Sequence, residues 1–260
     1  MRTCLLFPIA LAAACLAACK GSEPAPAVES VTIRLLALYG DSDTLPEPGR
    51  AILKAWISAN RVFDQSRTKV SLELAGIRKI TFSPTERIAD LQALVRQRDG
   101  RMDEVHEIRD SLEADLVVLF TPLPNGTING SVLATEATAF VIADWAQAGE
   151  PDYALAHELA HLFGAMHPGE KGAVADQLPS GFPWGDDSIR TVLDWSKGKT
   201  IPYFSNPEVS YGGKAIGVAG KQDIASVIRT TAAYISNFRG PKTATSFVPA
   251  GTIPSADFSE

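Results

Sequence analysis

The sequence predicts an α/β fold in which a largely parallel β-sheet packs against helices. Segments rich in apolar and β-branched residues alternate with segments whose apolar residues recur at helical spacing. Their order along the chain is strand, helix, strand, helix, helix, strand, which is the order of an α/β sandwich. Hydrophobic residues make up 45% and charged residues 21% of the 260 residues, the balance of a globular protein with room for a sizeable core.

Each element is predicted from its own pattern of apolar residues. Residues 31–39 (VTIRLLALY) are apolar and β-branched and predict a buried strand. Residues 70–74 alternate apolar with polar side chains, as in a half-exposed strand. Residues 116–120 (LVVLF) are almost wholly apolar, which is typical of a central strand. The other predicted elements are an amphipathic helix at 47–63, helices at 85–98 and 102–112, and a strand at 139–143.

The N-terminal residues are typical of an exported protein. Arg2 precedes an apolar run, residues 5–18, that is too short to span a bilayer but matches the apolar region of a signal peptide. The run ends in LAAC, which resembles a bacterial lipobox, so we expect residues 1–18 to be the signal peptide and Cys19 to receive a diacylglycerol group. The protein is then lipid-anchored in the bacterial cell envelope, and Lys20 favours the outer membrane. A plain secretory signal, and a secreted protein, is the alternative.

The rest of the chain divides into a linker, one domain and a tail. Residues 19–30 are polar and contain proline, as in a tether, and residues 241–260 are expected to form a flexible tail. All three cysteines lie in the first 19 residues, so disulfides and cysteine metal sites are not expected in the domain at 31–240. The net charge of −6 argues against a nucleic-acid partner. Nothing in the sequence indicates the oligomeric state.

The segment 154–167 (ALAHELAHLFGAMH) has the residue types and spacing of a zinc site. His157 and His161 are four residues apart, so on a helix both imidazoles project from one face and can reach one zinc ion. Glu158 lies beside the first of them, where it can accept a proton from a metal-activated water without being a ligand. Gly164 allows the helix to stop and the chain to turn, which brings His167 round as a third ligand. Three protein ligands are typical of catalytic zinc.

The distribution of histidines strengthens this interpretation. The chain contains only four histidines, and three of them occupy fixed positions of this one motif, so satisfied core histidines are a much weaker explanation. The fourth, His106, lies in the charged stretch DEVHEIRD and is predicted to be a solvated surface residue.

The sequence HELAHLFGAMH resembles the extended zinc signature of the metzincin peptidases. Three further stretches are similar to the bacterial reprolysin-like branch, which includes the peptidyl-Asp-type metalloendopeptidases: ANRVFDQS, EIRDSLEADLVVLF and IPYFSNPEVSYGG. The resemblance covers roughly residues 31–240. It implies a metzincin-like α/β fold with a twisted, mostly parallel sheet on helices that include the zinc helix. An upper subdomain ending at about residue 165 is then followed by a smaller, irregular lower subdomain that ends in a helix.

Two positions depart from the family pattern. Metzincins have a methionine in a tight turn beneath the zinc, followed two residues later by tyrosine; Leu193 and Trp195 stand at the matching positions of TVLDW. Leucine has a similar volume, so an apolar floor is kept at a cost below about 1.5 kcal/mol, whereas Trp195 has no phenolic group. Pro168 follows His167 where reprolysin-like members usually have aspartate.

The expected function is zinc-dependent hydrolysis of peptide bonds in a peptide or protein substrate, with Glu158 as general base. By the resemblance, the substrate extends along a sheet-edge strand within residues 132–143, and residues 200–206 form a wall of the specificity pocket. Two alternatives remain open: a zinc-binding lipoprotein of this fold with little or no catalysis, and a zinc hydrolase that acts on a non-peptide amide.

Overall fold

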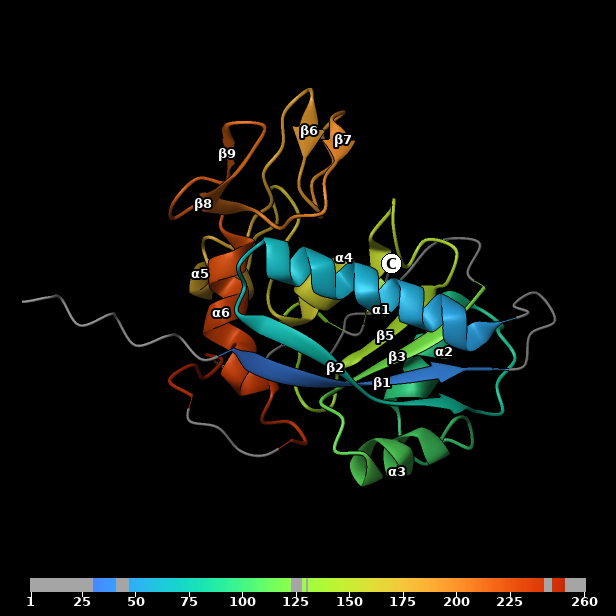
Figure 1. The fold of residues 1–260 in the computed structure, drawn as a ribbon. Helices are drawn as coiled ribbons and strands as arrows, with labels where there is room; N and C mark the ends of the chain where they lie inside the picture. Colours follow the sequence, from blue (N-terminus) through green and yellow to red (C-terminus); the bar gives the residue numbers. More distant parts are fainter. Residues whose placement is uncertain (1–29, 41–46, 123–127, 130, 241–244, 251–260) are drawn as a thin grey trace, which may run out of the picture.

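The protein is built around a five-stranded sheet of order β2-β1-β3-β5-β4 (Figure 1). The computed structural model describes residues 30–40, 47–122, 128–129, 131–240 and 245–250. Four neighbouring strands run parallel, and the short edge strand β4 is antiparallel to β5. The strands are β1 (Val31–Tyr39), β2 (Val70–Lys79), β3 (Leu116–Thr121), β4 (Ile128–Asn129) and β5 (Phe140–Asp144). The predicted α/β class and the mostly parallel sheet are therefore confirmed.

Helices cover both faces of this sheet because its central strands are apolar on both sides. Alternate residues of β1, such as Leu35 and Ala37, pack with α1 (Pro48–Gln65), α4 (Ala154–Leu162) and α6 (Ile224–Ile235) in the larger core. Leu36 and Leu38 point the other way. They pack with α2 (Arg87–Val95) and α3 (Glu104–Ser111) in a second core. In Figure 1 α1 and α3 lie on opposite sides of the sheet.

The chain after α4 forms short elements around a core of its own. It contains α5 (Ala173–Gln177), the parallel pair β6 (Ile189–Arg190) and β7 (Lys199–Thr200), and the antiparallel pair β8 (Asn206–Tyr211) and β9 (Lys214–Ile216). Ile201, Val209 and Ile216 form a small buried apolar cluster in this region. These strands form the upper part of Figure 1. The chain then returns through α6, which packs back into the main core.

Two predictions about the described residues are wrong. The sheet edge does not lie within 132–143, because β5 is paired on both sides and the edge strand is β4. His106 is not a surface residue, since only 9% of it is exposed. Its Nε2 lies 3.0 Å from the carbonyl oxygen of Arg96, and its ring packs edge-on against Phe140 at 5.4 Å. The acidic neighbours Glu104, Glu107 and Asp110 are exposed on the outer face of α3, whereas His106 is on the inner face.

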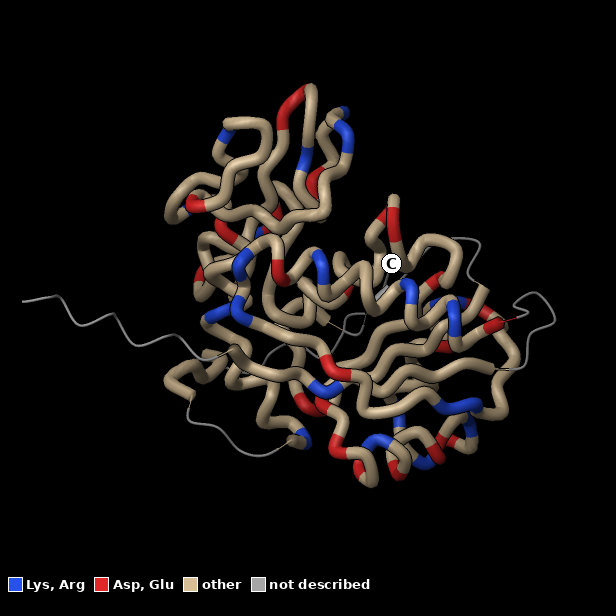
Figure 2. The backbone as a smooth tube through the Cα atoms, viewed as in Figure 1, with Lys and Arg blue, Asp and Glu red and all other residues tan. Residues whose placement is uncertain are grey.

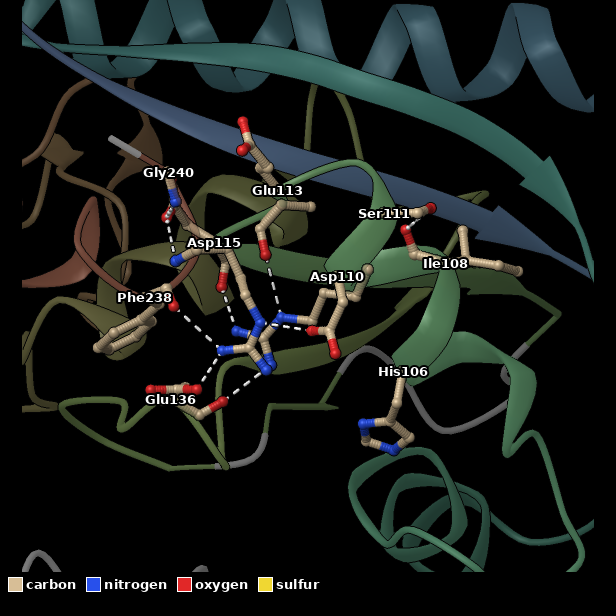
Figure 3. Close-up of polar contacts among 12 residues, drawn as sticks. His106, Ile108, Asp110, Ser111, Glu113, Asp115, Glu136, Phe238 and Gly240 are labelled. Carbon is tan, nitrogen blue, oxygen red and sulfur yellow. Dashed lines mark hydrogen bonds and ion pairs between the residues drawn. The ribbon is translucent and has the colours of Figure 1, made fainter. Parts of the chain in front are cut away.

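A buried arginine, Arg109, joins α3 to the sheet, and two of the residues that accept its hydrogen bonds, Asp115 and Glu136, are labelled in Figure 3. Arg109 is only 1% exposed, and its guanidinium donates to the carbonyl oxygens of Ala114, Asp115 and Glu136. It also lies over the ring of Phe140, 4.9 Å from the centroid. Burial lowers the pKa of Arg109 to about 10, so the side chain stays protonated at neutral pH. The network therefore buries one charge with an acceptor for each nitrogen of the guanidinium.

Asp115 extends the network to the end of the domain (Figure 3). Its carboxylate accepts from the backbone N–H groups of Arg34, Arg239 and Gly240 at 3.0–3.1 Å. The Arg239 side chain forms ion pairs with Asp110 and Glu136. These contacts tie the chain after α6 to the start of β3 and to the loop that contains Glu136.

Charges are mixed over the described chain, where Lys and Arg alternate with Asp and Glu (Figure 2). None of the described helices has the length and apolarity that crossing a membrane requires. Cys19 and the predicted signal peptide lie outside the described residues, as does most of the predicted tail. Within that tail, Phe247 is buried against Leu133, Leu178 and Val227.

Candidate metal centre

Helix α4 places two histidines one turn apart. Its apolar residues Leu155, Leu159 and Leu162 are fully buried in the main core, which fixes the rotation of the helix about its axis. His157 is half-buried and His161 is 4% exposed. Because these leucines face the core, the rotation of α4 is fixed, and both imidazoles project from it in one direction.

The turn after α4 returns the chain toward the helix. Gly164 has a φ of +100°, a conformation that side-chain-bearing residues rarely adopt, and a Cβ there would lie 2.5 Å from Cδ1 of Leu178. Ala165 N–H then donates to the carbonyl of Ala160 at 3.0 Å. The chain leaves this turn with His167 facing the two helical histidines.

The three imidazoles converge through their Nε2 atoms. Nε2 of His161 lies 3.1 Å from Nε2 of His157 and 3.2 Å from Nε2 of His167. One ligand atom from each residue lies within 4.8 Å of the others. A tetrahedral zinc ion with Zn–N bonds of about 2.0–2.1 Å separates neighbouring nitrogens by roughly 3.3 Å. The structure thus brings all three predicted ligands together with the spacing that zinc requires.

Backbone carbonyls determine the tautomers of two of these histidines. Nδ1 of His161 lies 2.7 Å from the carbonyl oxygen of Ala165, and Nδ1 of His167 lies 3.2 Å from that of Leu193. Because a carbonyl oxygen can only accept, each Nδ1 must donate its proton. Each Nε2 then has a free lone pair, which is the arrangement that metal-ligating histidines adopt.

This arrangement fits a cation. The lone pairs of His161 and His167 face each other at 3.2 Å, which is unfavourable unless a positive charge lies between them. Burial, together with the neighbouring imidazoles, lowers the pKa of His161 to about 4 and that of His157 well below its usual value. Both rings are therefore neutral at neutral pH, the form that binds metal. Three imidazoles suit zinc, and they leave a fourth position for water or substrate.

Two further side chains of interest lie close to the histidines. Glu158 follows His157 on α4 and is 9% exposed. Leu193 is 2% exposed and has a φ of +79°, so this buried residue occupies a tight turn whose carbonyl contacts His167. A non-glycine residue held in this conformation is often found at functional sites.

Contacts around His167 include two that the sequence analysis did not anticipate. The ring of Trp195 stacks on His167 with centroids 4.2 Å apart and planes at 30°, although Trp195 is 65% exposed. Glu170 accepts a hydrogen bond from the N–H of His167 at 3.1 Å. The family resemblance drew attention to the missing aspartate after His167, but it gave no reason to examine a glutamate two positions further on.

The family resemblance assigns two segments to substrate binding, residues 132–143 and 200–206. N–H groups of Leu133 and Ala134 donate to the carbonyls of His161 and Leu162, both at 2.8 Å, so residues 131–134 are attached to the end of α4. Within 200–206, four residues are buried and the others are half-buried. The buried ones are Ile201, Phe204, Ser205 and Asn206.

Comparisons with known proteins agree with this geometry. Residues 31–221 match the model of a family described as metallo-peptidase family M12B, reprolysin-like. A peptidyl-Asp metalloendopeptidase from Xanthomonas campestris pv. campestris is 30% identical over 237 residues, which are 85% of this chain and 54% of the relative. A protein of the same name from Stenotrophomonas maltophilia is 27% identical over 228 residues, 80% of this chain and 53% of the relative. The chain therefore spans about half the length of these curated relatives.

One solved structure is similar in fold. A chain in the structure of a chaperone-substrate complex superposes with a TM-score of 0.70 at 20% sequence identity. The superposition covers 83% of this chain and 37% of that chain. At this identity the likeness shows the fold alone.

Proposed function

Because the chain belongs to the reprolysin-like metallopeptidases of family M12B, we propose that it is a zinc-dependent endopeptidase. The observation that carries this proposal is the convergence of three Nε2 atoms beside a buried glutamate. His157, His161 and His167 are the proposed ligands. The converging imidazole nitrogens need a compensating partner, and a metal ion supplies one.

The proposed mechanism assigns one role to each side chain. When bound, zinc supplies Lewis-acid polarisation of the scissile carbonyl and lowers the pKa of water toward about 7. Glu158 accepts the proton of the attacking water and then delivers it to the leaving amine. The carbonyls of Ala165 and Leu193 hold the protons on Nδ1 of His161 and His167, so both rings keep the orientation that ligation requires. Leu193 provides the apolar floor of the site.

The proposed substrates are peptides that contain an acidic residue. Both curated relatives are named peptidyl-Asp metalloendopeptidases. The peptide is proposed to extend along the edge strand β4, where backbone groups not used in pairing with β5 can form strand-to-strand hydrogen bonds.

The variant Glu158→Gln tests the proposed mechanism. Gln keeps the shape of the side chain but cannot accept the proton, so zinc content and the melting temperature should stay nearly unchanged. Peptidase activity should fall by at least about a hundredfold, since general-base catalysis typically contributes about 10²–10⁴-fold. The exposed Glu208→Gln serves as the matched control. Activity of Glu158→Gln equal to that of the parent would assign the base to another group.

A metal-binding protein without catalysis is the second candidate. It is favoured by Trp195, which covers one face of His167 and cannot donate a phenolic proton. Full zinc occupancy in a parent protein that cleaves no member of a peptide library would select this candidate.

We also propose that the protein is attached to the bacterial envelope by a lipid at Cys19. The LAAC sequence supports this, and the change Cys19→Ser tests it. The variant should lose incorporation of labelled fatty acid and move from the membrane to the soluble fraction, because the acyl chains provide the attachment. Continued firm membrane binding of the variant would contradict the anchor.

A further inference from the structure

We propose that Arg190 recognises an acidic side chain of the substrate. This inference rests on the proposed peptidase function, and it adds the residue that selects the substrate. Arg190 ends β6, and the loop that follows it, residues 191–198, leads to β7. This loop contains Leu193, whose carbonyl contacts His167, and Trp195, whose ring stacks on the same histidine. Arg190 therefore belongs to the segment that borders the candidate metal centre.

The guanidinium of Arg190 is held in place by one residue of the loop and one residue of β7. Nε donates to Oγ1 of Thr200 at 3.0 Å, and Nη1 donates to the carbonyl of Ser196 at 3.0 Å. Ser196 follows Trp195, whose ring stacks on His167, and Thr200 begins the segment that the family resemblance assigns to the specificity pocket. The side chain is half-buried. Its position is thus fixed before any substrate binds, which reduces the entropy lost on binding.

These two bonds leave most of the donors of Arg190 unused. A guanidinium has five N–H donors, and the two hydrogen bonds occupy one on Nε and one on Nη1. The second N–H of Nη1 and both N–H groups of Nη2 have no partner among the residues that the structure describes. Two N–H groups on neighbouring nitrogens match the two oxygens of a carboxylate.

Among the described residues, no ion pair compensates the charge of Arg190. Asp194, the acidic residue of the same loop, uses its carboxylate to accept from the N–H of Ser196 at 2.8 Å. Lys214, on the neighbouring β9, is paired with Asp186. A half-buried cation without a carboxylate gains most from a ligand that brings one.

Two nearby lysines, Lys197 in this loop and Lys199 at the start of β7, provide a comparison. Lys197 and Lys199 are exposed, so water solvates their ammonium groups and little is gained when an acidic residue approaches. Arg190 differs from them in being half-buried and doubly hydrogen-bonded. Removing the charge of Lys199 is therefore a matched control for removing the charge of Arg190.

The test compares pairs of quenched fluorescent peptides that are identical except for Asp or Asn at one position. For the pair cleaved fastest, kcat/KM of the parent should be at least about thirtyfold higher for the Asp peptide, the range expected for loss of one partner of a desolvated charge pair. In Arg190→Gln this ratio should fall to within about threefold of one, while kcat/KM for the Asn peptide changes by less than about threefold. Arg190→Lys should be intermediate, since it keeps the charge but not the planar fork. Lys199→Gln should keep the parent ratio.

The assignment is overturned if the parent cleaves the Asp and Asn peptides equally well, or if the Asp-to-Asn ratio of kcat/KM is unchanged in Arg190→Gln. An equal loss of kcat/KM for both peptides in this variant also overturns it, because that result indicates a structural role. If the zinc-loaded parent cleaves no peptide, the proposed function fails and binding decides the role of Arg190. Fluorescence anisotropy with the same peptides should then show tighter binding of the Asp peptide that is lost in Arg190→Gln. Equal binding of both peptides would overturn the assignment independently of catalysis.

Discussion

Two buried polar clusters of this molecule differ in how their polar groups are satisfied. In the network around Arg109, each nitrogen of the guanidinium donates to a backbone carbonyl, and the carboxylate of Asp115 accepts three backbone N–H groups. In the histidine cluster, Nε2 atoms with free lone pairs converge within about the van der Waals distance. The first cluster is complete within the chain. The second is complete only when a cation is added.

The difference separates a structural role from a functional one. A satisfied buried network stabilises one packing arrangement and has no capacity left for a ligand. Converging acceptors without a donor destabilise the fold unless a ligand binds, and a protein retains them where the ligand is needed. The same criterion distinguishes Arg109, whose three nitrogens all have acceptors, from Arg190, whose Nη2 has no acceptor among the described residues. Burial alone does not make this distinction, because each cluster contains a residue that is at most 4% exposed, Arg109 in one and His161 in the other.

The largest effect is expected from His161→Ala. The change removes one of three proposed ligands and leaves an incomplete coordination shell, so bound zinc should fall from about one per chain to a small fraction, and peptidase activity should be lost. Elemental analysis of the purified protein measures the zinc content. His106→Gln is the matched control, because His106 is also a buried histidine but bonds to the carbonyl of Arg96. Full zinc in His161→Ala would place the ligands elsewhere.

A smaller effect, on stability and not on metal, is expected from Arg109→Leu. The three carbonyls that accept from Arg109 would be left without their donor in a buried environment. The free energy of unfolding, measured by urea denaturation, should fall by about 3–5 kcal/mol. The folded fraction should keep its zinc. Arg50→Leu, at an exposed helix position, should change stability by less than about 0.5 kcal/mol. A loss below about 1 kcal/mol in Arg109→Leu would mean that the network contributes little to the fold.

The smallest effect is expected from Leu193→Met. The two side chains have similar volumes, so the floor beneath the histidines should be kept, and the free energy of unfolding should change by less than about 1.5 kcal/mol. Zinc content should not change, since the contact with His167 is made by the backbone carbonyl. Thermal unfolding and elemental analysis measure both quantities. A loss of zinc in this variant would show that residue 193 shapes the metal centre through its side chain.

Much of the fold followed from local sequence patterns. The strand at 31–39 has the predicted bounds, and the helix predicted at 47–63 is α1. A continuous apolar run indicates a strand buried on both faces, and apolar residues at helical spacing indicate a helix buried on one face. Both patterns are local, so they can be recognised from the sequence of the element alone. Ends were less accurate: β2 extends from the predicted 70–74 to Lys79, because a strand continues as long as β1 offers backbone partners. Pairing with a distant strand leaves no local signal.

In the candidate site, too, some features could be predicted from the sequence and others only from the tertiary structure. The sequence alone indicated His157 and His161, since a spacing of four residues on a helix places both on one face whatever surrounds it. It indicated His167 through the turn at Gly164, and the role of Glu158 stays a prediction. Only the tertiary structure decided that the carbonyl of Leu193 contacts Nδ1 of His167, that His106 and Arg109 are buried, and that Arg190 donates to Ser196 and Thr200. The contact between His167 and Leu193 joins residues 26 positions apart, and Arg109 reaches the carbonyl of Glu136 across 27 positions. Charged and polar side chains carry no periodic signal that reveals such a contact, because the partner that satisfies them can come from anywhere in the fold.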